Sequence, residues 1–275
     1  MTAVELTNVP TSVLVEQTVT LARSEPVLQS DEYWAHVRVL HFRAGRDVFE
    51  EAIKLCSNPE AIPRAVGADI LAQLGVRDGV AVFPFADESA GPLVTLLADA
   101  EPIVIASALY ALGHLGRGEP PQLARLSTHA SEEVRHALAY ALGGRTDAIS
   151  TEVLVALSGD VDTDTRDWAT FALGALSDED TPAIRDALIA RLNDSDDDVR
   201  AEAIAGLAKR RDERAVQPLL QELRLPEVGV LVIEAAGEMP RPEFMSPLEA
   251  LNTAHPECRH KCEEVARNRR PLAAS

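Results

Sequence analysis

The sequence predicts an all-α protein, a right-handed α-solenoid of stacked helix pairs with a helical cap at each end. Apolar residues recur at the spacing of an amphipathic helix in Val134, Ala137, Leu138, Ala141 and Leu142. Altered copies of this stretch return about every 30 residues, which is typical of stacked supersecondary units. Aromatic residues make up only 4% of the chain, as expected where alanine and leucine fill narrow gaps between helices.

Each copy begins at a marker position and has a small residue eight positions later. The markers are residues 64, 105, 135, 166, 200 and 229, and glycine or alanine stands eight residues after every one. Small residues at these places should let neighbouring backbones approach closely. A shorter helix precedes each marker, and acidic loops such as residues 194–198 join the two helices. Carboxylates there can cap the second helix and complement its dipole.

This pattern resembles HEAT repeats, in particular the short bacterial type first associated with phycobilin lyases. The family pattern is Asp-x-x-Val-Arg-x-x-Ala-x-x-Ala-Leu-Gly. Residues 196–208 match it with Gly206 and Ala208 as small substitutes, and residues 131–143 match it with Ser131 for the acid and Leu138 for the first alanine. The resemblance covers about two thirds of the chain. It implies a ladder in which the helix arginines bond to loop acids of neighbouring repeats. Arg64, Arg135, Arg166 and Arg200 are therefore expected to be structural, and Ile105 and Gly229 interrupt the ladder.

The chain is expected to divide into three parts. Residues 1–58 form an N-terminal helical cap, residues 59–240 form six repeats, and residues 241–275 form a C-terminal helical cap and tail. An insert near residues 75–90 lengthens the first step of the repeat, and its Phe83 and Phe85 either cover the core or contact a ligand.

The N-terminal cap gathers aromatic and basic residues between Tyr33 and Arg46. At helical spacing they could be buried packing, and their density could equally mark a partner site. Both interpretations stay open.

The charge of the chain limits its partners. It has 26 basic and 44 acidic residues, a net charge of −18. Affinity for nucleic acids rests on lysine and arginine that neutralise phosphates, so this composition disfavours nucleic acid and anionic membranes alike. The start, Met1–Val9, lacks the basic and apolar regions of a signal peptide, and no apolar run approaches the length of about 18 residues that spans a bilayer. We therefore expect a cytoplasmic protein.

No cofactor or metal is expected. Cys258 and Cys262 could share a helix face with His255. The two cysteines also continue the apolar stripe of their helix, and cysteine is commonly a small buried hydrophobe. No nucleotide-binding loop, nucleophile elbow or zinc-protease motif occurs, so no catalytic residue is assigned.

The register of the repeat predicts a binding site. Counting six positions along each second helix from the residue before its marker gives Asp69, Tyr110, Tyr140, Phe171, Ala205 and Glu234. The resemblance implies that this position faces away from the core, onto the concave face. Three successive repeats place an aromatic ring there, and exposed aromatic stripes generally mark interaction sites. Neighbouring candidates are His114 and His136 near the tyrosines, and Asp167 and Trp168 near Phe171. The alternative is that these rings are covered and belong to the core.

The sequence thus favours a non-enzymatic scaffold that holds a protein or peptide on its concave face. The alternative is a HEAT-like enzyme, lyase-like or DNA-glycosylase-like, acting in the same groove. None of the seven histidines is followed by glutamate, which argues against the His-Glu pairs of the HEAT-like di-iron hydroxylases. The acidic composition also disagrees with the basic groove of the glycosylases.

Overall fold

The computed structural model describes residues 6–24, 30–77 and 80–254. It divides into two compact units, residues 1–142 and residues 143–275. The boundary falls inside the repeat array, between the third and the fourth helix pair.

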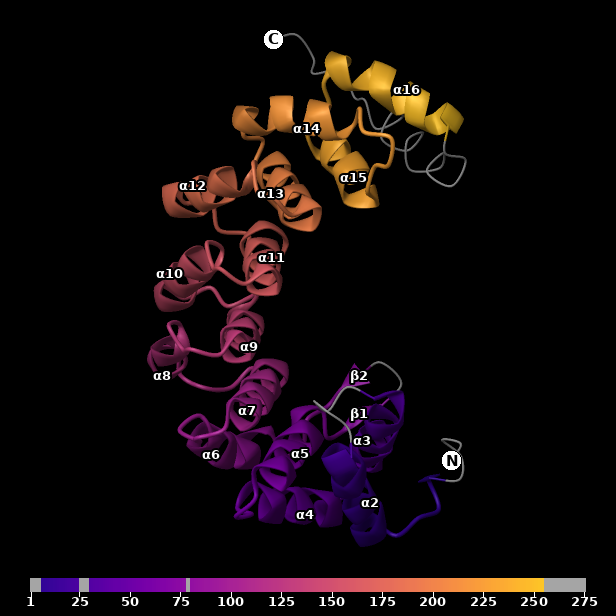
Figure 1. Ribbon diagram of the computed structural model, residues 1–275, viewed down its shortest axis with the longest axis vertical. Helices are drawn as coiled ribbons and strands as arrows, with labels where there is room; N and C mark the ends of the chain where they lie inside the picture. The colour runs from indigo at the N-terminus through magenta and orange to yellow at the C-terminus, as the bar shows by residue number, and fades with distance from the viewer. Residues whose placement is uncertain (1–5, 25–29, 78–79, 255–275) are drawn as a thin grey trace. The chain divides into compact units, whose positions relative to one another are not determined.

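The first unit holds the cap and three helix pairs. Its elements are α2 (Thr11–Ser24), α3 (Asp31–Arg43), α4 (Arg46–Cys56), α5 (Ala61–Ala72), β1 (Val76–Arg77), β2 (Val80–Ala81), α6 (Ala86–Leu96), α7 (Pro102–Leu115), α8 (Pro120–Leu123), the 3-10 turn η1 (Ala124–Leu126) and α9 (Glu132–Leu142). The second helices of the pairs stand in a row, because α5 packs against α7 and α7 against α9 (Figure 1). The first helix of the first pair, α4, lies within residues 1–58, the stretch expected to form the cap.

Local sequence signals fix the ends of α7. Pro102 occupies its first turn, where its missing N–H has no partner to lose. Gly116 ends the helix in the left-handed conformation with φ 61°. Between them, Val104, Ile105 and Leu109 are buried, so this helix forms the centre of the core of the first unit.

Small residues let the second helices approach closely, as the sequence predicts. A Cβ atom built on Gly113 of α7 would lie 3.0 Å from Cα of Ala141 and 3.0 Å from Cδ1 of Tyr140, both on α9. Any larger residue at this point would crowd the Tyr140 ring.

The insert forms a short antiparallel hairpin of β1 and β2, in which Val76 pairs with Ala81. It is the one departure from the all-α expectation among the described residues. After the hairpin, Phe85 stacks on Phe49 of α4 with ring centroids 4.7 Å apart, and the Arg46 guanidinium lies over both rings. Phe85 is therefore packed against α4.

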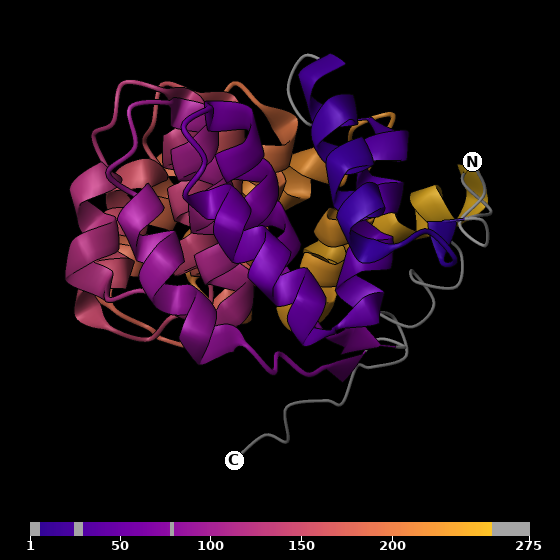
Figure 2. The same cartoon turned by 90° about the horizontal axis from the view of Figure 1, so that it is seen from below.

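The cap helices α2 and α3 pack against α5, and Figure 2 shows them in indigo beside the purple first pair. Tyr33, His36 and His41 are buried. Arg43 donates to the carbonyl oxygens of Leu6, Thr7 and Val9 and to the Thr11 hydroxyl, which holds residues 6–11 against α3. Part of the aromatic and basic cluster of the cap is therefore buried, whereas Trp34, Arg38, Phe42 and Arg46 are exposed.

The second unit repeats the same pairing. Its elements are α10 (Ala148–Leu157), α11 (Thr163–Phe171), the π-helical turn η2 (Ala172–Leu176), α12 (Pro182–Arg191), α13 (Asp197–Lys209), η3 (Glu213–Ala215), α14 (Val216–Glu222), α15 (Val230–Glu238), η4 (Pro242–Phe244) and α16 (Met245–Ala254). Helix α13 packs against α11 on one side and α15 on the other. The Cys258–Cys262 motif lies outside the described residues.

The arginine ladder is confirmed where its partners are described. Arg64 bonds to both oxygens of Asp99 in the next loop, at 2.7 and 2.8 Å. Arg166 bonds in the same way to Asp194, at 3.1 and 3.0 Å.

The other two rungs differ in detail. Arg200 bonds to Glu222 at 3.0 Å, so its partner lies in a helix of the neighbouring repeat rather than in a loop. Arg135 donates to the carbonyl oxygens of His129 and Ala130. Arg200 thus ties its helix to the next repeat, whereas these Arg135 bonds hold the loop that precedes its own helix.

Arg210 performs a related task after α13. Its guanidinium donates to five carbonyl oxygens, those of Leu173, Gly174, Ser177, Glu179 and Gly206. It thus satisfies carbonyls at the ends of η2 and α13.

Candidate partner-binding site

Two tyrosines and two histidines form paired hydrogen bonds between α7 and α9. The Tyr110 hydroxyl lies 2.6 Å from Nδ1 of His136, and the Tyr140 hydroxyl lies 3.0 Å from Nδ1 of His114. The two tyrosine rings meet edge to face, with centroids 5.2 Å apart. Each helix contributes one tyrosine and one histidine spaced one turn apart, so the pairs form because α7 and α9 lie side by side.

Gln73, directly after α5, extends this group to a third helix pair. Its Nε2 lies 3.0 Å from Nε2 of His114. Burial lowers the pKa of His114, which favours the neutral ring, and burial raises the pKa of Tyr140. In a neutral ring that accepts from Gln73 at Nε2, Nδ1 carries the hydrogen and donates to the Tyr140 hydroxyl. Sequence reasoning missed Gln73, because it follows the helix end and lies outside the counted register.

We call these five side chains, Gln73, Tyr110, His114, His136 and Tyr140, the Tyr–His ladder. All five are half-buried. Each therefore packs on its neighbours and still presents part of its surface to solvent. Hydrogen bonds between the side chains restrain their positions.

Asp69 does not join this surface. It is only 6% exposed, and the Tyr33 hydroxyl of the cap donates to its Oδ2 at 2.6 Å. Burial raises the pKa of Asp69 to about 6, against the opposing hydrogen bonds from Tyr33 and Ser107. The prediction that Asp69 lies exposed on the concave face is wrong, because α3 covers this position of the first repeat.

The remaining candidates lie in the second unit. Phe171 and Trp168 of α11 form an aromatic pair with centroids 5.4 Å apart, and both are half-buried. Burial, together with nearby carboxylates, raises the pKa of Asp167. Glu234 is exposed on α15, and Ala205 is half-buried on α13. That Phe171 continues the stripe of Tyr110 and Tyr140 stays a prediction.

Two kinds of feature are absent from the described residues. No group of three or more histidine, cysteine, aspartate or glutamate residues in that part of the chain could hold a metal ion. No helix there is both long and apolar enough to cross a membrane.

Comparison with known proteins agrees with the repeat architecture. A sequence model of HEAT repeats matches residues 90–174, 151–236 and 185–267. Protein YibA of Escherichia coli strain K12 is 33% identical over 213 residues, which make up 74% of this chain and 73% of YibA.

Solved structures give the same result. The X-ray structure of Escherichia coli YibA matches with a TM-score of 0.73 at 26% identity, over 97% of this chain and 94% of that one. A designed armadillo repeat protein matches with a TM-score of 0.52 at 19% identity, over 69% of this chain and 97% of that one. This second likeness concerns the fold alone.

Proposed function

Since the chain belongs to the HEAT-repeat family, we propose that it is a non-enzymatic scaffold whose Tyr–His ladder binds a protein or peptide segment. The ladder lies on the second helices of adjacent pairs, and such helices together offer an extended surface for a partner.

The observation that carries this proposal is the half-burial of Tyr110 and Tyr140 within one hydrogen-bonded group. Tyrosine provides a large apolar ring and a polar hydroxyl on a side chain with few rotatable bonds, and it is enriched among the residues that dominate binding energies. A ring already held by its neighbours loses little further freedom when a partner binds. The ladder therefore has the properties of a preorganised binding surface.

The acidic composition supports a protein or peptide over a nucleic acid. With a net charge of −18, the chain repels phosphate backbones, whose binding depends on lysine and arginine. The ladder itself carries no side chain with a fixed positive charge. A polypeptide needs no such charge.

A pull-down from a lysate of the native host tests the proposal. The double variant Tyr110→Ala/Tyr140→Ala is compared with the native chain and with Phe42→Ala, which removes another exposed ring of the same unit. We expect a specific partner to be lost from the double variant and kept by Phe42→Ala.

Melting temperatures are measured on all three proteins. If the double variant melts far below the others, the rings act mainly as packing and the proposal fails. It also fails if the folded double variant retains every partner of the native chain.

A further inference from the structure

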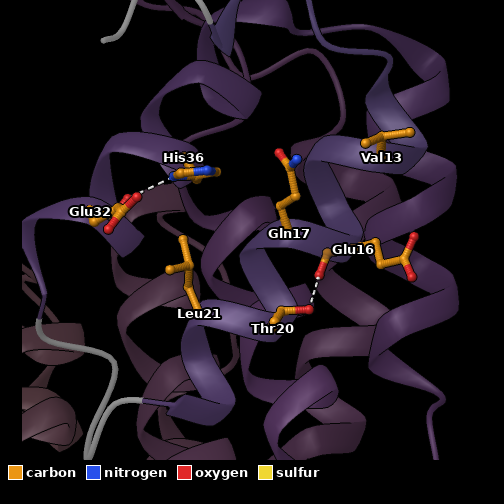
Figure 3. Close-up of a pocket in the computed structure, with 7 residues that line it drawn as sticks. All are labelled: Val13, Glu16, Gln17, Thr20, Leu21, Glu32 and His36. Carbon is orange, nitrogen blue, oxygen red and sulfur yellow. Dashed lines mark hydrogen bonds between the residues drawn. The ribbon is translucent and has the colours of Figure 1, made fainter. Parts of the chain in front are cut away.

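The cap carries an open cleft between α2 and α3 that the Tyr–His ladder does not use. The cleft is lined from α2 by Val13, Glu16, Gln17, Thr20 and Leu21, and from α3 by Glu32 and His36 (Figure 3). Its volume is about 500 Å³, which leaves room for a long side chain.

His36 presents a hydrogen-bond acceptor to this cleft. The residue is only 3% exposed, and its Nδ1 lies 2.8 Å from the carbonyl oxygen of Glu32. A carbonyl can only accept, so Nδ1 carries the hydrogen and, in the neutral ring, Nε2 is an acceptor. No hydrogen bond within the described residues engages Nε2.

Gln17 provides a second acceptor. Its Oε1 is a buried atom without a hydrogen-bond partner in the described part of the chain. Figure 3 shows the Gln17 amide and the His36 ring facing the same space between the two helices. Leaving a buried polar atom without a partner costs free energy, and a donor in the cleft would recover it once the Gln17 side chain turns its Oε1 toward the cleft.

Charge and apolar surface complete the cleft. Glu16 and Glu32 contribute two carboxylates, and neither forms an ion pair with another described residue. Val13 is 41% exposed, and Leu21 lies one turn beyond Gln17. The lining therefore combines acceptors and negative charge with an aliphatic wall.

We propose that this cleft binds a lysine or arginine side chain of a polypeptide partner. The aliphatic stem of such a side chain can lie along Val13 and Leu21, while its charged end donates to Gln17 Oε1 and His36 Nε2. Lysine offers three donors and arginine five, and neither accepts, which matches a cleft in which Gln17 Oε1 and His36 Nε2 receive no donor from the described residues. The carboxylates of Glu16 and Glu32 then neutralise the positive charge. The site uses no residue of the Tyr–His ladder, so either proposal can fail without the other.

Nuclear magnetic resonance titration of the isotope-labelled full chain tests this site. The probes are N-acetyl-arginine amide and N-acetyl-lysine amide, with N-acetyl-norleucine amide as the matched probe that has a stem and no charge. We expect the signals of the His36 ring and the Gln17 side-chain amide to shift with both basic probes and to stay in place with norleucine. Equal shifts with norleucine, or tighter binding of N-acetyl-glutamate amide, would overturn the proposal.

Variants locate the binding. Glu32→Gln removes one charge from the cleft and Gln17→Leu removes one acceptor, whereas Glu50→Gln removes an exposed charge on α4, outside the cleft. We expect affinity for N-acetyl-arginine amide to fall about tenfold in each of the first two variants, because each loses a hydrogen bond or charge contact to a cation. Glu50→Gln should bind like the native chain. An equal loss in Glu50→Gln would mean that only the general negative charge attracts the probe, and the site would be rejected.

Discussion

The Tyr33 hydroxyl donates a hydrogen bond of 2.6 Å to Oδ2 of Asp69 and so joins the cap to the first repeat. His41, on the same helix as Tyr33, donates from Nε2 to the main-chain oxygen of Asp69 at 2.9 Å. Burial raises the pKa of Asp69 to about 6 and lowers the pKa of His41 to about 4. Two buried groups at one junction thus have opposite pKa shifts.

These shifts predict opposing effects of pH on stability. In the unfolded chain the pKa of aspartate is about 3.9 and that of histidine about 6.5. The raised pKa of Asp69 contributes stability below about pH 3.9, and this contribution is lost as the pH rises through about 6. The lowered pKa of His41 contributes stability above about pH 6.5, and this contribution is lost as the pH falls through about 4. Between pH 4 and 6 the two therefore offset each other.

Single substitutions should separate the two effects. Relative to the native chain, the free energy of unfolding of Asp69→Asn should rise from pH 4 to 6.5, and that of His41→Gln should fall from pH 4 to 6. Each change should reach about 2–3 kcal/mol, because one pKa unit corresponds to about 1.4 kcal/mol. Urea unfolding at four pH values measures it. If the free energies of unfolding of both variants followed the same pH dependence as that of the native chain, neither group would have a shifted pKa.

The arginine ladder predicts unequal costs for two arginines of one unit. Two hydrogen bonds join Arg64 and Asp99, whose side chains are 17% and 9% exposed. The side chains of the ion pair Arg23 and Glu60 are 49% and 63% exposed. Arg64→Ala should lower the free energy of unfolding by about 1.5–3 kcal/mol, since it leaves a largely buried carboxylate without its partner. Arg23→Ala should cost less than about 1 kcal/mol. Equal losses in urea unfolding would contradict the structural role of the ladder, and Arg166→Ala should behave like Arg64→Ala.

Alanine substitutions at Gly113 and Gly91 should have opposite effects on the stability of the chain. At Gly113 the added methyl group would lie 3.0 Å from the Tyr140 ring and from Cα of Ala141, whereas at Gly91 in α6 nothing lies within 4 Å. Gly113→Ala should destabilise the chain by about 1–3 kcal/mol through overpacking. Gly91→Ala should stabilise it by about 0.5–1 kcal/mol, because alanine loses less conformational freedom in a helix. Thermal unfolding of both variants checks this, and a stabilised Gly113→Ala would show that α7 and α9 can separate freely.

Substitutions at the neighbouring residues Arg210 and Arg211 should change the stability of the second unit in opposite directions. Arg210→Lys should lower the free energy of unfolding by about 3 kcal/mol, because lysine cannot reproduce a planar fork of donors to five carbonyls. The next residue, Arg211, has φ 51°, a conformation in which glycine is preferred. Arg211→Gly should therefore stabilise the chain by about 1 kcal/mol. If Arg210→Lys unfolded at the same urea concentration as the native chain, the capping role would be refuted.

The sequence predicted the part of the site that follows from the repeat period. Tyr110, His114, His136 and Tyr140 lie together because α7 and α9 are equivalent helices in adjacent pairs, and their register is visible in the spacing of the markers. The arginine ladder was implied by the resemblance to HEAT repeats.

Contacts outside the period were beyond the reach of the sequence. Asp69 is equivalent to Tyr110 by register, yet Tyr33 buries it, and Tyr33 belongs to a cap that does not repeat. Gln73 bonds to His114 from just beyond α5, where the helical period no longer applies. The hairpin at Val76–Ala81 pairs only two residues on each strand, too few to produce an alternating pattern.

Site-specific photocrosslinking tests the binding role of the Tyr–His ladder most directly. A benzophenone side chain is introduced at Tyr140 and, as the matched control, at Phe42, which is 51% exposed on the cap of the same unit. After irradiation in cells of the native host, we expect a discrete protein or peptide adduct from the Tyr140 position, absent from the Phe42 position. Folded protein that yields no adduct at position 140, or the same adducts at both positions, would contradict a partner-binding role for the ladder.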